Sequence, residues 1–283
     1  MMMMGVCLTM TMMAQTRNQR PIYQKGDSIT VCRLLSEVQH QLGGTNIPLF
    51  FARQFLGVPY VAHTLESEGE ERLVVNTRQL DCTTLVETVT ALTQCAYSRQ
   101  YTWQAYLRNL TSMRYRKGII DRYPSRIHYF TEWITQNSKR GLVTEIQQPD
   151  PPFAAIQTVK VSYMSQHPDS YQALRQHPDY VGEIWRMEQQ VSGQRFRYIP
   201  KERVGRSAEL RQVVKDGDII AITCKKAGLD IAHLGFAMWK NGNLHLLNAS
   251  QIRKKVVEEP MTLWQYLHQH PSHTGIRILR INK

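Results

Sequence analysis

Residues 231–250 read IAHLGFAMWKNGNLHLLNAS and decide how the C-terminal part of the chain folds. Two apolar runs, 232–239 and 244–249, flank the four residues 240–243, whose central pair is Asn-Gly. Asn-Gly between two such runs is a strong short-range signal for a β-hairpin, because both residues tolerate the positive φ of a type I′ turn. The stretch therefore predicts two antiparallel strands joined by a tight turn.

The predicted turn also fixes the register of the hairpin and places Gly235 opposite Asn248. Side chains alternate between the two faces of a strand, so His233 lies on the same face as Asn248, as a diagonal neighbour about 7–8 Å away at the backbone. His245 instead pairs with Met238 and falls on the opposite face. An imidazole and a carboxamide are therefore expected within side-chain reach of each other on adjoining strands.

The segments outside the hairpin predict an α+β fold. Further short apolar strands are expected at 218–223 and 275–281. Upstream, apolar residues repeat with helical spacing at 28–43 and 48–56, and 102–137 also has a helical pattern. Helices come first and antiparallel strands follow, which is the α+β arrangement.

A further helix is predicted from Asp81 onward. Leu85, Val89, Leu92 and Ala96 occupy one helical face. Asp81 stands at the N-cap position, where its carboxylate can accept the free N–H groups of the first turn. The segment is rich in Thr and Val, so a strand stays open as an alternative.

The spacing of these elements suggests a nucleophilic site. His233 beside Asn248 supplies a base whose ring is held by a third group, as in cysteine hydrolases. Cys82 would be the first residue of the helix after Asp81, where free N–H groups and the helix dipole favour a thiolate and could stabilise an oxyanion. The alternative is that Cys82 is a small buried hydrophobic residue, as most cysteines are.

Composition limits the classes of function that remain. The chain has 283 residues and a formal net charge of +12, with 42% hydrophobic and 20% charged residues, as in ordinary folded proteins of one or two domains. The positive charge is consistent either with a solvated, soluble surface or with binding to an anionic polymer. No helix striped with Arg and Lys and no aromatic RNA-binding motif is present, so specific nucleic-acid binding is not expected. Beyond the first fifteen positions no run of about 18 apolar residues occurs, so no integral membrane partner is implied.

The N-terminal residues 1–14 are apolar, rich in Met and uncharged, which resembles the apolar part of a secretory signal with cleavage after Ala14. The segment lacks a basic start, so a disordered start is the alternative. We expect an exported, periplasmic protein, or a cytoplasmic one if the segment is not a signal. Neither CxxC nor a Cys/His zinc spacing occurs, so neither a metal nor another cofactor is expected. The cysteines are Cys7, Cys32, Cys82, Cys95 and Cys224.

Several motifs together resemble those of a known family. They are Gly57–Tyr60 (GVPY), Leu80–Glu87 (LDCTTLVE), Tyr115–Gly118 (YRKG), Ser125–Tyr129 (SRIHY), Gly217–Ile220 (GDII) and Gly228–Gly235 (GLDIAHLG). The set is similar to that of papain-like (NlpC-type) bacterial cell-wall cysteine hydrolases, and most similar to their N-acetylmuramoyl-L-alanine amidase-like branch. The resemblance covers about residues 45–283. It implies a papain-like core within a single catalytic domain, 15–283, with a mainly helical insertion around 98–210.

The resemblance also implies a reaction and a set of site residues. Cys82 would attack an amide carbonyl and His233 would transfer the proton, on peptidoglycan fragments (muropeptides), at the bond between N-acetylmuramic acid and L-alanine. This branch often carries His within His-Ala-Ser at the third catalytic position, where this chain has Asn248-Ala249-Ser250. Candidate substrate contacts, each with a purely structural alternative, are Tyr60, Asp81, Thr83, Arg126, His128, Tyr129 and Asp230.

Two other functions remain open at this point. The first is a peptidase that cuts within the stem peptide after D-glutamate. The second is a wall-binding protein on the same scaffold that has lost catalysis, although retention of Cys82, His233 and Asn248 argues against it.

Overall fold

The computed structural model describes residues 20–41, 43–67 and 69–283. The suggested signal segment, 1–14, lies outside these residues. Among the described helices, none is both long and apolar enough to cross a membrane. The α-helices are α1 Lys25–Val38, α2 Ile47–Arg53, α3 Cys82–Tyr97, α4 Trp103–Arg114, α5 Phe130–Lys139, α6 Tyr163–Gln166, α7 Gln172–Gln176, α8 Tyr180–Val191, α9 Ser207–Val213 and α10 Leu263–His268.

An eight-stranded antiparallel sheet forms the other half of the fold. Its order is β2-β3-β8-β4-β5-β6-β7, and β1 pairs with β8 beside β3. Together with the helices this confirms the mixed α+β class. The strands are β1 Val143–Ile146, β2 Ala155–Thr158, β3 Arg195–Pro200, β4 Ile219–Cys224, β5 Ile231–Lys240, β6 Asn243–Ser250, β7 Lys255–Glu258 and β8 His273–Ile281.

The hairpin of β5 and β6 forms in the predicted register. Met238 pairs with His245, and the pairing extends as far as Phe236 opposite Leu247. Both turn residues have positive φ, 49° at Asn241 and 81° at Gly242, as the type I′ turn requires. Continued by one residue, this register places Gly235 opposite Asn248. Because side chains alternate along a strand, His233 and Asn248 then lie on the same face of the sheet.

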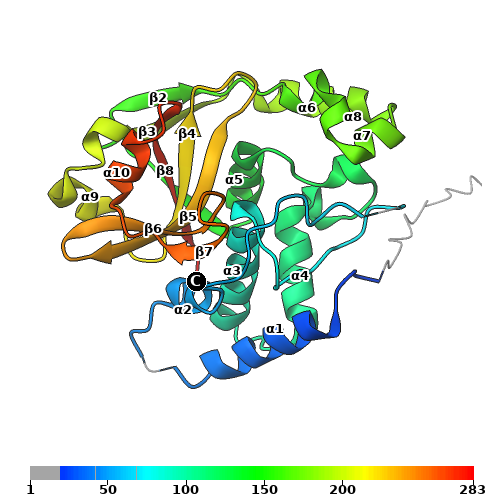
Figure 1. Ribbon diagram of the computed structural model, residues 1–283, viewed down its shortest axis with the longest axis horizontal. Coiled ribbons are helices and arrows are strands. Elements are labelled where there is room, and N and C mark those ends of the chain that lie inside the picture. Colours follow the sequence, from blue (N-terminus) through cyan, green and yellow to red (C-terminus); the bar gives the residue numbers. More distant parts are fainter. Residues whose placement is uncertain (1–19, 42, 68) are drawn as a thin grey trace, which may run out of the picture.

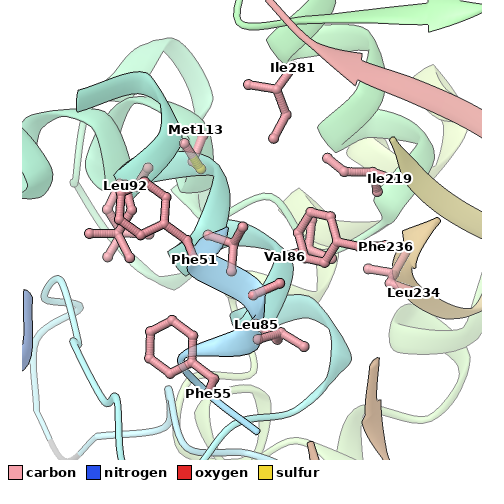
Figure 2. Close-up of a cluster of buried hydrophobic side chains, with 14 of the residues drawn as sticks. Phe51, Phe55, Leu85, Val86, Leu92, Met113, Ile219, Leu234, Phe236 and Ile281 are labelled. Atoms are coloured by element: carbon pink, nitrogen blue, oxygen red, sulfur yellow. The ribbon is translucent and has the colours of Figure 1, made fainter. Parts of the chain in front are cut away.

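Both faces of the sheet are covered (Figure 1), with α3 and its neighbouring helices on one side and α9 and α10 on the other. On the first face Phe236 and Ile219 pack with α3, and Figure 2 shows them close to Val86. On the second face Leu246 and Ile278 pack with α9 and α10. This explains why every residue of β4 is buried, since a central strand in three layers has no solvated face.

Helix α3 is confirmed, and the strand alternative for this segment is wrong. The Asp81 carboxylate accepts a hydrogen bond from the backbone N–H of Thr84 at 2.8 Å, and the Thr84 hydroxyl accepts one from the Asp81 N–H at 2.9 Å. This reciprocal capping begins the helix despite its many β-branched residues. The helix contacts α1, α2, α4 and β5 and is buried almost all round, which is why its sequence shows little polar face.

The middle of the chain contains more strand than the sequence pattern indicated. The segment around 98–210 was expected to be mainly helical, and it holds β1, β2 and β3 as well as helices. The first two are only four residues long, which is too short for a clear alternation. Strand β7 and helix α10 near the C-terminus were also not anticipated. Helices α6 to α8 pack around a separate apolar cluster away from the sheet (Figure 1).

Candidate active site

The Cys82 side chain lies at the junction between helix α3 and strand β5. Asp81 is the N-cap, so Cys82 is the first residue of the helix. Its sulfur lies close enough to the backbone N–H of Leu234, the residue after His233 on β5, for that group to lower the pKa of the thiol. The N-terminus of the central helix therefore meets the sheet at the strand that carries the predicted imidazole.

His233 and Asn248 form the contact that the hairpin register predicts. His233 Nε2 lies 3.0 Å from Asn248 Oδ1. Since the amide oxygen can only accept, Nε2 carries the proton and donates it, which leaves Nδ1 of the ring with a free lone pair. Asn248 is fully buried, so this bond is not in competition with solvent. The amide fixes both the orientation and the tautomer of the ring.

Burial keeps the thiol and the imidazole neutral at pH 7. Burial, together with the neighbouring Asp81 carboxylate, raises the pKa of Cys82 to about 12, and hydrogen bonds from Leu234 and Thr83 only partly offset this. Burial likewise lowers the pKa of His233, against the opposing effect of the bond to Asn248. The raised pKa contradicts the expectation that the helix N-terminus favours a thiolate at Cys82. A neutral imidazole, however, is the form that can accept a proton.

Two phenol rings, Tyr60 and Tyr266, lie next to the thiol. Burial and then the nearby Cys82 and Asp81 raise the pKa of Tyr60 to about 12, so its hydroxyl stays protonated. Tyr266, from α10, also lies close enough for Cys82 to raise its pKa, and its ring faces that of His233 at 6.0 Å between centroids. Tyr60 is one of the residues predicted from the sequence. Tyr266 is not, because it belongs to no motif and reaches the site only through the packing of α10 on the sheet.

Asp81 and Thr83 have identifiable local roles beside the nucleophile position. One Asp81 oxygen caps α3 through Thr84, as described above. The hydroxyl and backbone N–H of Thr83 act on the Cys82 thiol and lower its pKa, against the larger effect of burial. Both residues thus shape the surroundings of the thiol directly.

Arg126, predicted as a substrate contact, is only 5% exposed. It donates hydrogen bonds to Glu66 Oε1 at 2.9 Å and to the Leu65 carbonyl at 3.2 Å. Its guanidinium also stacks over the ring of Tyr123 at 4.8 Å. These contacts form an internal ion pair that links the loop containing Leu65 and Glu66 to the segment from Tyr123 to Arg126.

His128 and Tyr129 are engaged in the same region. His128 Nε2 bonds to the carbonyl oxygen of Tyr123 at 3.1 Å, and burial, with Arg126 nearby, holds its pKa well below the usual value. The Tyr129 hydroxyl donates to Glu188 at 2.7 Å, inside the cluster formed with α6 and α8. Among the described residues, no hydrogen bond or ion pair links either side chain to Cys82 or His233.

Asp230 links the sheet to helix α5. Its carboxylate accepts the backbone N–H of Thr131 at 2.6 Å, in the first turn of α5, where a negative charge is favourable. Its carbonyl oxygen accepts a hydrogen bond from the Gln157 side chain at 2.7 Å. The residue thereby fixes the position of the strand that begins just before His233.

Neither metal ligation nor disulfides account for this arrangement. Within the described ranges, no group of three or more His, Cys, Asp or Glu side chains is arranged to hold a metal ion. The described cysteines, Cys32, Cys82, Cys95 and Cys224, are all free thiols. The chemistry available at the site is thus that of a thiol, an imidazole, a carboxamide and two phenols.

Comparisons with known proteins place the chain in a family. The N-acetylmuramoyl-L-alanine amidase-like family matches residues 50–276. A crystal structure of an N-acetylmuramoyl-L-alanine amidase from Bacteroides uniformis is similar, with a TM-score of 0.78 and 40% identity over 84% of this chain and 98% of that chain. A Bacteroides fragilis protein provisionally named as a xylanase has a TM-score of 0.76 and 38% identity over 82% and 99% of the two chains.

More distant comparisons concern the fold alone. A Legionella pneumophila protein shares the fold with a TM-score of 0.67 and 21% identity, over 90% of this chain and 94% of that one. No curated protein sequence matches the chain. The family match over most of the length and the 40% identity to the Bacteroides uniformis structure show that this chain belongs to the N-acetylmuramoyl-L-alanine amidase-like family and is a peptidoglycan amidase-type hydrolase.

Proposed function

We propose that the chain is a cysteine amidohydrolase with a papain-like core, and that it cleaves the amide between N-acetylmuramic acid and L-alanine in muropeptides. The observation that carries the proposal is the 3.0 Å bond between His233 Nε2 and Asn248 Oδ1. That bond leaves Nδ1 as the basic atom of the ring. The thiol of Cys82 lies near the backbone N–H of Leu234, which follows His233 on β5.

In the proposed acylation step, His233 Nδ1 takes the proton of the Cys82 thiol as the sulfur attacks the carbonyl carbon of the lactyl group. The carbonyl oxygen becomes an oxyanion, which the backbone N–H of Cys82 at the helix start and the Tyr60 hydroxyl are candidates to stabilise. When the oxyanion reforms the carbonyl, the C–N bond breaks and the imidazolium gives its proton to the leaving amine of L-alanine. A thioester to Cys82 remains.

In the proposed deacylation step, a water molecule attacks the thioester and gives its proton to His233 Nδ1. Collapse of the second intermediate breaks the C–S bond, and the imidazolium returns its proton to the thiolate. The muramic acid product leaves as the carboxylic acid and loses its proton to solvent. The neutral resting pair suits this sequence, because the base must be unprotonated when substrate arrives. Asn248 keeps Nε2 engaged throughout, so Nδ1 stays the atom that moves the proton.

The test is digestion of defined muramyl peptides followed by mass analysis of the products. We expect free N-acetylmuramic acid and an intact peptide that begins with L-alanine. A dipeptide product would establish the stem-peptide endopeptidase instead. Cys82→Ala should remove turnover while leaving the fold intact, and Cys32→Ala, at an exposed position on α1, is the matched control that should retain it. Full activity of Cys82→Ala would exclude the mechanism.

The xylanase name of one similar structure points to a different bond. Hydrolysis of glycosidic bonds generally uses two carboxylic acids on either side of the bond. The carboxylate next to Cys82 belongs to Asp81 and is engaged in capping α3, so the local chemistry supports amide cleavage better. Incubation with xylan is a simple control, and we expect no reducing sugar to be released.

The location of the protein is part of the same proposal. An apolar start at 1–14 favours export to the periplasm, where peptidoglycan lies. Cell fractionation of the full chain tests this, and retention in the cytoplasm would indicate that the segment is not a signal.

A further inference from the structure

A group of stacked rings begins beside His233. The ring of Tyr266 lies 6.0 Å from that of His233, and His270 lies 4.8 Å beyond it. His273 stacks on His270 at 4.6 Å with an interplanar angle of 13°. We call Tyr266, His270 and His273 the imidazole cluster. It comes from α10, the following turn and the start of β8, and the mechanism proposed above assigns a role to neither of its histidines.

The imidazole cluster has hydrogen-bonding atoms that the protein does not use. His270 Nδ1 lies 2.8 Å from the carbonyl oxygen of Tyr266, so it donates its proton there and its Nε2 is left available. His273 is only 6% exposed, yet its Nδ1 has no hydrogen-bond partner among the described residues. A buried polar atom without a partner is costly, which suggests that it is satisfied by something other than the chain itself.

The surroundings of the cluster are positively charged. Burial, with contributions from His270, His233, Lys226 and Lys201, lowers the pKa of His273 to about 4. Glu259 and Asp81 are the acids that act on His233. Glu259 also acts on Tyr266, and its carboxylate is bound to Arg253 at 3.0 Å. His270 and His273 therefore stack on each other with no carboxylate hydrogen-bonded to either ring among the described residues, and two lysines are close enough to act on the pKa of His273.

We propose that the imidazole cluster, with Lys226 and Lys201, is a subsite for a carboxylate of the stem peptide. The inference rests on the proposed function, because it assumes that the peptide side of the substrate leaves the Cys82 site along the sheet. In such a substrate the sugar is uncharged and the carboxylates lie on the peptide, the first of them on the D-glutamate after L-alanine. The ring contacts that lead from His233 to His270 measure 6.0 Å and 4.8 Å between centroids, so together they extend over at most about 11 Å, which about three extended residues can span.

The test compares muramyl tripeptides that differ only in charge. One substrate has every peptide carboxylate free, and in the others the D-glutamate carboxylate or the C-terminal carboxylate is converted to a carboxamide. Loss of a charge-assisted hydrogen bond should lower kcat/KM of the native enzyme about tenfold for at least one carboxamide, mainly through KM. If neither conversion changes kcat/KM by more than about twofold, the subsite does not exist.

Variants then assign the effect to the cluster. His270→Gln should lose the discrimination, so that its kcat/KM for the charged substrate and for the carboxamide are the same within about twofold. His268→Gln is the matched control, because His268 makes the same 2.8 Å contact to the carbonyl four residues before it and stacks on Trp264, outside the cluster. It should discriminate as the native enzyme does. Discrimination that survives in His270→Gln would overturn the assignment.

A binding measurement separates this proposal from the proposed function. In Cys82→Ala, addition of the free tripeptide should raise the pKa of His273, followed by NMR of the imidazole C–H groups, because a bound carboxylate favours the imidazolium. The tripeptide amidated at its carboxylates should leave the titration unchanged. An unchanged titration with the charged tripeptide would overturn the subsite even if the enzyme proves to be an amidase. A shift without muropeptide cleavage by the native protein would support the subsite and reject the amidase mechanism.

Discussion

Replacing Asn248 with aspartate changes the charge that His233 faces and leaves the shape almost unchanged. In the native protein a neutral amide oxygen accepts the Nε2 proton at 3.0 Å, and burial holds the pKa of His233 below its ordinary value. In Asn248→Asp a carboxylate would accept the same proton. A negative charge next to the ring favours the imidazolium, so the pKa of His233 should rise.

The size of this rise follows from the contact itself. Hydrogen bonds to charged groups contribute about 1.5–3 kcal/mol, against about 0.5–1.5 kcal/mol for neutral pairs. The difference is about 1.4 kcal/mol, which corresponds to about one pKa unit. Because the base must be neutral to take the thiol proton, about tenfold less enzyme would be competent at a pH below both pKa values.

The assay is the pH dependence of kcat/KM on a defined muramyl peptide, whose acid limb reports the pKa of the base in the free enzyme. The acid limb of Asn248→Asp should move upward by about one unit, and the rate on the alkaline plateau should be less affected. His245→Gln is a suitable control, since His245 lies on the opposite face of β6 and bonds to the Glu259 carbonyl at 3.1 Å. Its acid limb should coincide with that of the native enzyme.

One result would refute the reasoning. If Asn248→Asp is folded, as judged by circular dichroism and its melting temperature, and its acid limb is unmoved or moves to lower pH, then the Asn248 contact does not control the base. In that case either His233 is not the base, or the residue at 248 faces another group during catalysis.

Three further predictions concern stability. Gly235→Ala should lower the free energy of unfolding by about 1–3 kcal/mol, because an added Cβ would lie 2.7 Å from a carbonyl oxygen of the facing strand. Gly182→Ala on α8, where an added Cβ would make only an ordinary contact with the Arg186 side chain at 3.9 Å, should be neutral or stabilising. Urea melts that ranked the two variants equally would contradict the close approach at Gly235. Arg114→Met should lower the free energy of unfolding by about 3–5 kcal/mol in the same assay, because it removes the partner of the buried Glu87 carboxylate, which lies 2.7 Å from Arg114 in the native protein. A change near zero would show that this ion pair is not isolated from water. Burial holds the pKa of His128 in the folded protein well below the value that this side chain has in the unfolded chain. The unfolded chain therefore binds more protons at low pH, and the free energy of unfolding should fall as the pH drops below about 6.5. His128→Phe should remove about 1–2 kcal/mol of that fall between pH 7 and 5, and an unchanged slope in pH-dependent unfolding would count against a buried neutral ring.

Short-range rules predicted much of this molecule because they depend on neighbouring residues. The Asn-Gly turn set the register of β5 and β6, and with it the contact between His233 and Asn248. Asp81 and Thr84 are three residues apart, so their reciprocal capping could be expected before the fold was known. The same rules failed for β1, β2 and β7, whose four residues give no readable alternation.

The tertiary structure decided the electrostatics and the outer part of the site. Sequence predicted a helix N-terminus at Cys82, but the burial that raises the pKa of its thiol comes from packing against β5. The imidazole cluster, which includes Tyr266, lies beside His233 only because α10 folds back over the sheet. Local pattern fixes which residues share a strand face or a helix end. Desolvation and charge proximity depend on distances between segments far apart in the chain, and only the packed structure sets those.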